Sequence, residues 1–209
     1  MKRFIRLSFI LLFLLAIPLA INALSYINFD FHYGFLKLKE QAIATGWYLP
    51  AYYAHVLVAG VILVIGLFQI HPTWGLYWKR LHRTFGRIYV FGILFFSAPG
   101  GLVMSFFINR GPWVLTSFLL QCGLWFTCTY LAYRYIRQGK IQDHRQWMLR
   151  SYSLTLAAIT LRLYVFLSSW SFDLAQPVAY ATIAWLSWLP NLLLCEWYLK
   201  INSRRVLAT

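Results

Sequence analysis

The sequence predicts an all-α integral membrane protein, a bundle of six helices. First, 61% of its 209 residues are hydrophobic and only 11% are charged, a composition that excludes an ordinary soluble domain. Second, several apolar runs are long enough to cross a bilayer. Third, the Lys and Arg residues cluster in short segments between these runs, as the positive-inside rule describes. This clustering accounts for the net charge of +14 without a nucleic-acid partner.

We expect one transmembrane domain over residues 1–209, with spans at about 7–25, 51–70, 88–108, 113–135, 148–170 and 178–199. The first span follows three basic residues and contains Pro18, and we interpret it as a retained helix rather than a signal peptide. Residues 26–50 mix aromatic and charged side chains, which predicts an element on the outer membrane surface. In the third span, Pro99 and the two glycines after it predict a bend.

The distribution of basic residues predicts the orientation. Fifteen of the nineteen Lys and Arg residues precede span one, separate spans two and three, separate spans four and five, or follow span six. Both termini are therefore expected in the cytoplasm of a bacterium, with the protein in the cytoplasmic (inner) membrane. The expected partners are the lipid bilayer, anionic lipids included, and a larger membrane complex.

The stretch from His144 to Arg162 carries the most information. In a continuous helix His144, Ser151, Thr155 and Arg162 lie on one stripe, and its ends are about 27 Å apart, close to the thickness of the hydrocarbon core. An arginine at membrane depth usually faces protein or water, so this stripe predicts a functional face. The alternative is that the hydroxyls bond their own helix carbonyls and that helix carbonyls also satisfy Arg162.

The second and third spans carry similar polar stripes. When these polar stripes are placed in a six-span topology, residues at similar membrane depth form two predicted clusters. The outer one contains His55 and Arg162. The cytoplasmic one contains Gln69, His82, Tyr89, His144 and Ser151.

One chemistry that fits the cytoplasmic cluster is a haem b. His82 and His144 would be axial ligands of the haem iron, and Arg83, Arg145 and Arg150 would neutralise the propionates. A quinone is an alternative cofactor. The same cluster could instead bind an anion or the headgroup of a lipid. A zinc site of His55, His82 and His144 would need a carboxylate, and acids are nearly absent.

Other side chains have simpler interpretations. The two His–Arg pairs can be ordinary cytoplasmic anchors. Glu196 and Lys200 are spaced i, i+4 in the favourable order, so we expect a local ion pair there.

The motifs LHRTFGRIYV at 81–90 and HRQWMLRSYSLTLAAITLR at 144–162, with His55 and Gln69 before them, resemble the bacterial family of predicted membrane proteins catalogued as domain of unknown function 2306. The resemblance covers roughly residues 50–170 and implies a multi-span membrane protein without an established activity. The matching positions are His55, His82, Arg83, Gly86, His144, Trp147, Met148, Arg150 and Arg162.

These observations predict a membrane redox carrier or oxidoreductase subunit that holds haem b or quinone between its helices. The alternative is a non-catalytic accessory or lipid-binding subunit of a larger complex.

Overall fold

The computed structural model describes residues 2–71, 77–168, 170 and 177–207. These residues form helices and no strand, and they include six helical segments long and apolar enough to cross a membrane. The all-α fold and the six spans are therefore confirmed. The chain divides into two compact units, residues 1–107 (unit 1) and 108–209 (unit 2). The cytoplasmic location of the termini stays a prediction.

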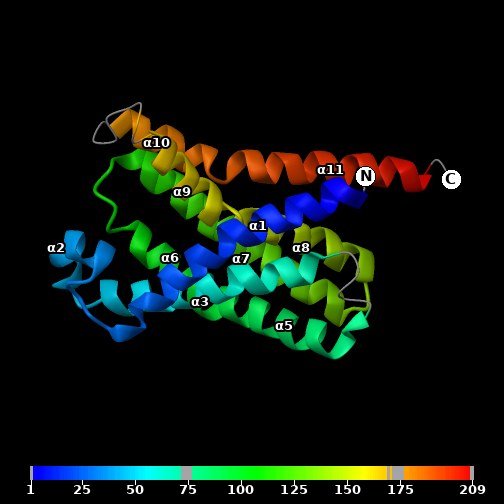
Figure 1. Cartoon of the computed structure of the whole chain (residues 1–209), viewed down its shortest axis with the longest axis horizontal. Helices are drawn as coiled ribbons and strands as arrows, with labels where there is room; N and C mark the ends of the chain where they lie inside the picture. Colours follow the sequence, from blue (N-terminus) through cyan, green and yellow to red (C-terminus); the bar gives the residue numbers. More distant parts are fainter. Residues whose placement is uncertain (1, 72–76, 169, 171–176, 208–209) are drawn as a thin grey trace. The chain divides into compact units, whose positions relative to one another are not determined.

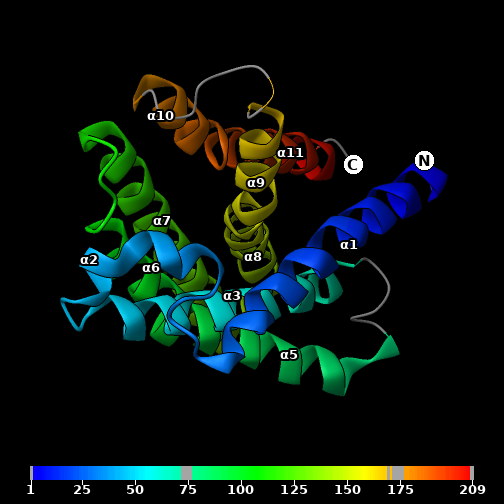
Figure 2. The ribbon, with the colours of Figure 1, turned by 60° about the vertical axis from the view of Figure 1, so that its left-hand side comes forward.

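The described part of unit 1 contains two spanning helices before residue 72 and one interrupted span after residue 76. Its elements are α1 (Lys2–Leu24), η1 (Ser25–Asn28), η2 (Gly34–Lys39), α2 (Glu40–Ile43), α3 (Tyr48–Ile70), α5 (Lys79–Gly92), the π-helix η3 (Ile93–Ser97) and α6 (Ala98–Ser105). Helix α3 packs against α1, α5, η3 and α6, and both Figure 1 and Figure 2 show it beside α1 and α5. The predicted surface segment 26–50 is a series of short helical turns.

Small residues let the helices of unit 1 approach closely, as is common in membranes. A Cβ added to Gly60 of α3 would lie 2.7 Å from Ala23 Cβ of α1. A Cβ on Gly92 would lie 2.8 Å from Ile62 Cδ1 of α3. The tightest of these contacts is at Gly100 of α6, where a Cβ would lie 2.5 Å from the Ala51 carbonyl oxygen. Three neighbouring helices thus approach α3 closely at glycines, and at Gly100 the approach is to the α3 backbone.

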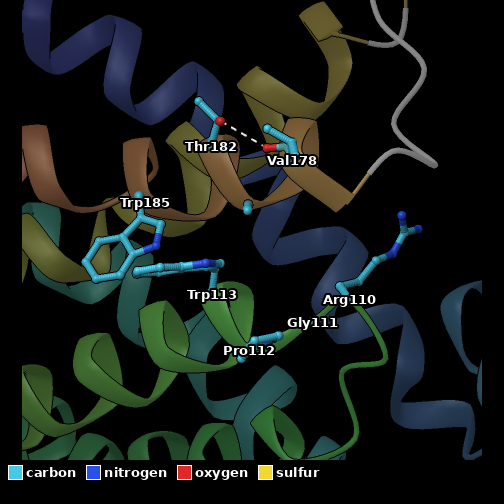
Figure 3. A pocket seen from close by; sticks show the side chains of 8 residues that line it. Arg110, Gly111, Pro112, Trp113, Val178, Thr182 and Trp185 are labelled. Carbon is cyan, nitrogen blue, oxygen red and sulfur yellow. Dashed lines mark hydrogen bonds between the residues drawn. The ribbon is translucent and has the colours of Figure 1, made fainter.

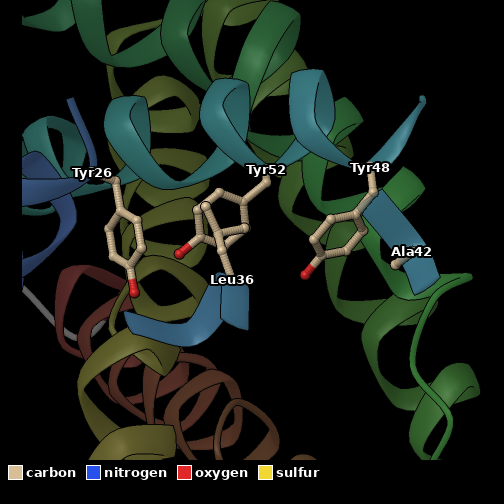
Figure 4. Packing of buried hydrophobic residues seen from close by; sticks show 5 residues of the cluster. All are labelled: Tyr26, Leu36, Ala42, Tyr48 and Tyr52. Carbon is tan, nitrogen blue, oxygen red and sulfur yellow. The ribbon is translucent and has the colours of Figure 1, made fainter. Parts of the chain in front are cut away.

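A cluster of tyrosines closes one end of unit 1. Tyr48 and Tyr52 project from α3 and pack with Tyr26 and Leu36, which come from the short helices (Figure 4). The Tyr26 and Tyr52 ring centroids are 5.2 Å apart at an edge-to-face angle of 73°, a favourable aromatic geometry. The Tyr26 hydroxyl accepts a hydrogen bond from the Phe35 backbone N–H at 2.9 Å. The segment after α1 is therefore packed onto α3.

Unit 2 consists of α7 (Pro112–Arg137), α8 (Ile141–Thr155), α9 (Ala157–Ser168), α10 (Pro177–Leu186) and α11 (Leu189–Leu207). Helix α8 packs against α7 and α11, and α10 packs against α7 and α9. Figure 1 shows α8 and α9 following one another, as do α10 and α11. Spans five and six are thus each made of two helices.

Three span interiors differ from the expectation. The third span begins at Lys79 rather than at Ile88, and a π-helix interrupts it before Pro99. The fifth span is interrupted at Leu156, so the stripe from His144 to Arg162 is not one continuous helix.

The sixth span is interrupted just before Pro190, a residue that has no N–H to donate. There the Ser187 carbonyl oxygen accepts hydrogen bonds from the hydroxyl of Thr160 and from the side-chain amide of Asn191. Polar side chains therefore replace helix bonding at this break, as is usual in membranes.

Candidate functional site

Two residues of the predicted cytoplasmic cluster meet in unit 1. Gln69, at the end of α3, donates a hydrogen bond from Nε2 to the His82 carbonyl oxygen of α5 at 3.1 Å. Gly86 faces the same amide, because a Cβ there would lie 3.4 Å from Gln69 Oε1. Tyr89, one turn further along α5, is fully buried, and Arg83 is exposed. Gln69 therefore contacts the His82 backbone, while the predicted cluster of side chains stays a prediction.

The imidazole of His55 is held by the interrupted third span. Its Nδ1 lies 2.6 Å from the Ser97 carbonyl oxygen, and since a carbonyl only accepts, Nδ1 carries the proton. Ser97 ends the π-helix η3, and π-helical turns are frequent at functional sites. The Ser97 hydroxyl is itself buried, with no hydrogen-bond partner among the described residues. A buried hydroxyl in that state points to a place for a water or ligand.

His144 shows the same arrangement in unit 2. It lies in the first turn of α8, half-buried, and its Nδ1 is 2.8 Å from the Ala132 carbonyl oxygen of α7. Nδ1 is therefore the donor, and in the neutral imidazole the lone pair lies on Nε2. A backbone carbonyl on one ring nitrogen is the usual support for a histidine whose other nitrogen binds a metal.

The hydroxyls of the 144–162 stripe contact α7. Ser151 Oγ lies 2.7 Å from Thr129 Oγ1, and the Trp125 indole N–H donates to Thr155 Oγ1 at 3.0 Å. Thr155 Oγ1 also donates to its own helix, at the Ser151 carbonyl oxygen. These groups are buried, so this part of the stripe joins two helices.

Arg150 forms an ion pair that the sequence interpretation missed. Its Nη2 donates to Glu196 Oε2 at 2.9 Å, and its Nε donates to the other carboxylate oxygen. The guanidinium also lies 4.6 Å from the centroid of the Trp147 ring. The expectation of a local partner for Glu196 therefore overlooked Arg150, a residue 46 positions away. A bidentate pair of this kind depends on helix packing, which sequence spacing does not reveal.

The other predicted basic residues differ in their surroundings. Arg145 is exposed beside His144. Arg162 is exposed on α9 and donates from Nη1 to the Ala158 carbonyl oxygen of its own helix at 3.0 Å, as the simpler interpretation expected. His55 belongs to unit 1 and Arg162 to unit 2, so the predicted outer pair stays a prediction.

The donor groups limit which metal centre fits. Among the residues that the structure describes, no three His, Cys, Asp or Glu side chains are grouped to hold a metal ion. A zinc site of His55, His82 and His144 has no support there. A haem iron needs only axial imidazoles, since the porphyrin supplies the other ligands.

Comparison with known proteins gives one result. The profile of the family described as "Predicted membrane protein (DUF2306)" matches residues 52–199, a range that includes every predicted site residue. No curated protein matches the chain, and no solved structure does. Because the profile covers well over half of the sequence, the chain belongs to the DUF2306 family of predicted membrane proteins.

Proposed function

We propose that the protein is a membrane redox carrier that binds haem b, with His144 as an axial ligand. The observation that carries this proposal is the hydrogen bond from His144 Nδ1 to the Ala132 carbonyl oxygen. It fixes the ring orientation, and it selects the neutral tautomer whose Nε2 can bind iron. An outer hydrogen bond of this kind also raises the basicity of a metal-ligating imidazole.

The candidates for the second axial ligand are His55 and His82. His55 shares the carbonyl support on Nδ1, and His82 is the residue that the sequence pairs with His144. Exposed Arg83 and Arg145 suit the propionates. Arg150 suits them less, because two of its N–H groups already bind Glu196. When bound, the haem would supply one-electron chemistry, and the chain's residues would hold it and set its potential.

Reduced-minus-oxidised absorbance spectra of the purified protein test the proposal. The wild type should give the Soret and α bands of a b-type haem after expression with adequate haem. His144→Gln should lose them, and either His55→Gln or His82→Gln should weaken them. His32→Gln is the control, because His32 is exposed and hydrogen-bonds locally to Asp30. A wild type without a Soret band contradicts the proposal.

A non-catalytic accessory or lipid-binding subunit is the second candidate. Its support is the α7–α8 interface, where Ser151 and Thr155 serve helix packing. A quinone carrier would also lack a Soret band, so organic extracts of the purified protein should be examined for quinone in the same experiment.

A further inference from the structure

A pocket of about 400 Å³ lies between the start of α7 and one face of α10. Figure 3 shows Arg110 at one side of it and the indoles of Trp113 and Trp185 at the other. Its volume lies within the range of small-molecule and cofactor sites. None of the predicted haem residues lines it, so it requires a separate explanation.

The walls of this pocket are apolar. Trp113 is 72% exposed and Val178 is 76% exposed, and Pro112 and Ala181 complete the surface. The Thr182 hydroxyl donates to the Val178 carbonyl oxygen at 3.0 Å, so it is used within its own helix. Indole rings at the end of a membrane span typically lie at the level of lipid headgroups. The walls therefore suit an acyl chain or a glycerol backbone.

The mouth of the pocket is cationic. Arg110 lines the pocket, and its guanidinium lies 5.0 Å from the centroid of the Tyr180 ring. None of the described residues that line the pocket is acidic. An arginine presents a planar set of N–H donors that matches a phosphate group in a bidentate manner.

We propose that this pocket binds an anionic phospholipid, with the phosphate at Arg110 and an acyl chain along Trp113 and Trp185. The apolar walls favour a lipid over a free anion, because a soluble phosphate gains nothing from indole surface. The Arg110 guanidinium at the mouth favours an anionic headgroup over a zwitterionic one. The proposal is independent of the haem, because it rests on other residues of unit 2.

Native mass spectrometry of the detergent-purified protein, supplied with equal amounts of phosphatidylglycerol and phosphatidylcholine, tests this site. The wild type should retain phosphatidylglycerol preferentially. Arg110→Gln should reduce that preference roughly tenfold, as expected for loss of a charge-assisted contact. Arg137→Gln is the matched control, since Arg137 is an exposed arginine in the last turn of α7, far along the helix from the pocket residues Pro112 and Trp113. It should behave as the wild type does.

Two further arms complete the test. Trp113→Ala should lower retention of both lipids, because it removes wall surface without removing charge. Excess inorganic phosphate should not displace the bound lipid. Three results would overturn the proposal: equal retention of the two lipids by the wild type, an equal effect of Arg137→Gln and Arg110→Gln, or displacement by inorganic phosphate.

Discussion

The two units hold their helices together by different means. In unit 1, glycines allow α1, α5 and α6 to pack closely against α3, and two side chains of α3, Gln69 and His55, add hydrogen bonds to backbone carbonyls. In unit 2, indoles and hydroxyls join the helices, as in the hydrogen bond from Trp188 Nε1 to Ser117 Oγ at 2.9 Å. Lipid tails are as apolar as the side chains, so close packing and polar contacts must supply the helix association. Both units nevertheless fix an imidazole in the same way, on a backbone carbonyl.

The strongest test of this contrast is Gly100→Ala in unit 1. The new Cβ would lie 2.5 Å from the Ala51 carbonyl oxygen and 3.0 Å from the His55 backbone nitrogen. Neither backbone atom can move without shifting α3, so we expect a loss of about 1–3 kcal/mol in the free energy of unfolding. Unfolding in mixed micelles, followed by far-ultraviolet circular dichroism, measures it.

Gly123→Ala in α7 is the matched control, because apart from the backbone of its own helix no described heavy atom lies within 4 Å of its added Cβ. Alanine is the better helix former, so this variant should be as stable as the wild type or more stable. Equal destabilisation by both substitutions would contradict the steric account of unit 1.

In unit 2 the largest effect is expected at the ion pair. Arg150 has an 18% exposed side chain and Glu196 a 45% exposed one, so solvent screens the pair in part. We expect Glu196→Gln to lower the free energy of unfolding by about 1–2 kcal/mol. Arg150→Lys should also be destabilising, since lysine cannot form the bidentate contact. Unchanged stability of both variants would show that the pair contributes nothing.

The hydroxyl contacts should have a smaller effect. A double-mutant cycle of Thr129→Val and Ser151→Ala should give a coupling energy of about 0.5 kcal/mol, the usual size for such bonds in membrane proteins. Thr127→Val is the control, because Thr127 is exposed and its hydroxyl donates to the Gly123 carbonyl oxygen of its own helix. An equal coupling energy between Thr127 and Ser151 would contradict a specific contribution of the hydrogen bond between Thr129 and Ser151.

The smallest effect concerns His71, which follows α3 and lies 4.8 Å from the Phe9 ring centroid. Burial lowers the pKa of His71 below its ordinary value of 6.5. The unfolded chain therefore binds the proton more readily, and His71 costs stability as the pH falls from above 6.5 toward the lowered folded pKa. His71→Phe should reduce the acid-side loss in a pH series of unfolding curves. An identical pH profile in the variant would exclude this role.

The sequence predicted the six spans because apolar runs of bilayer length separate basic loops. From helical periodicity it also predicted a cluster that contains Gln69 and His82. The structure has a hydrogen bond from Gln69 to the His82 backbone, and the cluster of side chains stays a prediction. Helical periodicity predicts which residues share a face only within an uninterrupted helix. The interruptions at η3, Leu156 and Ser187 depend on contacts from other helices, such as the Thr160 hydroxyl on the Ser187 carbonyl.

The partners of the site residues were harder to predict. Arg150 reaches Glu196 on another helix, and the imidazoles of His55 and His144 donate to carbonyls whose residue types carry no signal. Any residue can present a carbonyl oxygen, so no pattern in the sequence marks Ser97 or Ala132 as the acceptor. The pocket at Arg110 likewise combines residues from two helices that are distant in sequence.

The proposal that His144 is a preset iron ligand has a direct test in the haem content of the purified protein. The pyridine haemochrome assay gives moles of haem b per mole of chain, for the wild type and for His144→Gln expressed with the same haem supply. We predict stoichiometric haem b in the wild type and its loss in His144→Gln, with both proteins folded by circular dichroism. A folded wild type without haem b, or a His144→Gln protein that keeps all of it, would contradict the account.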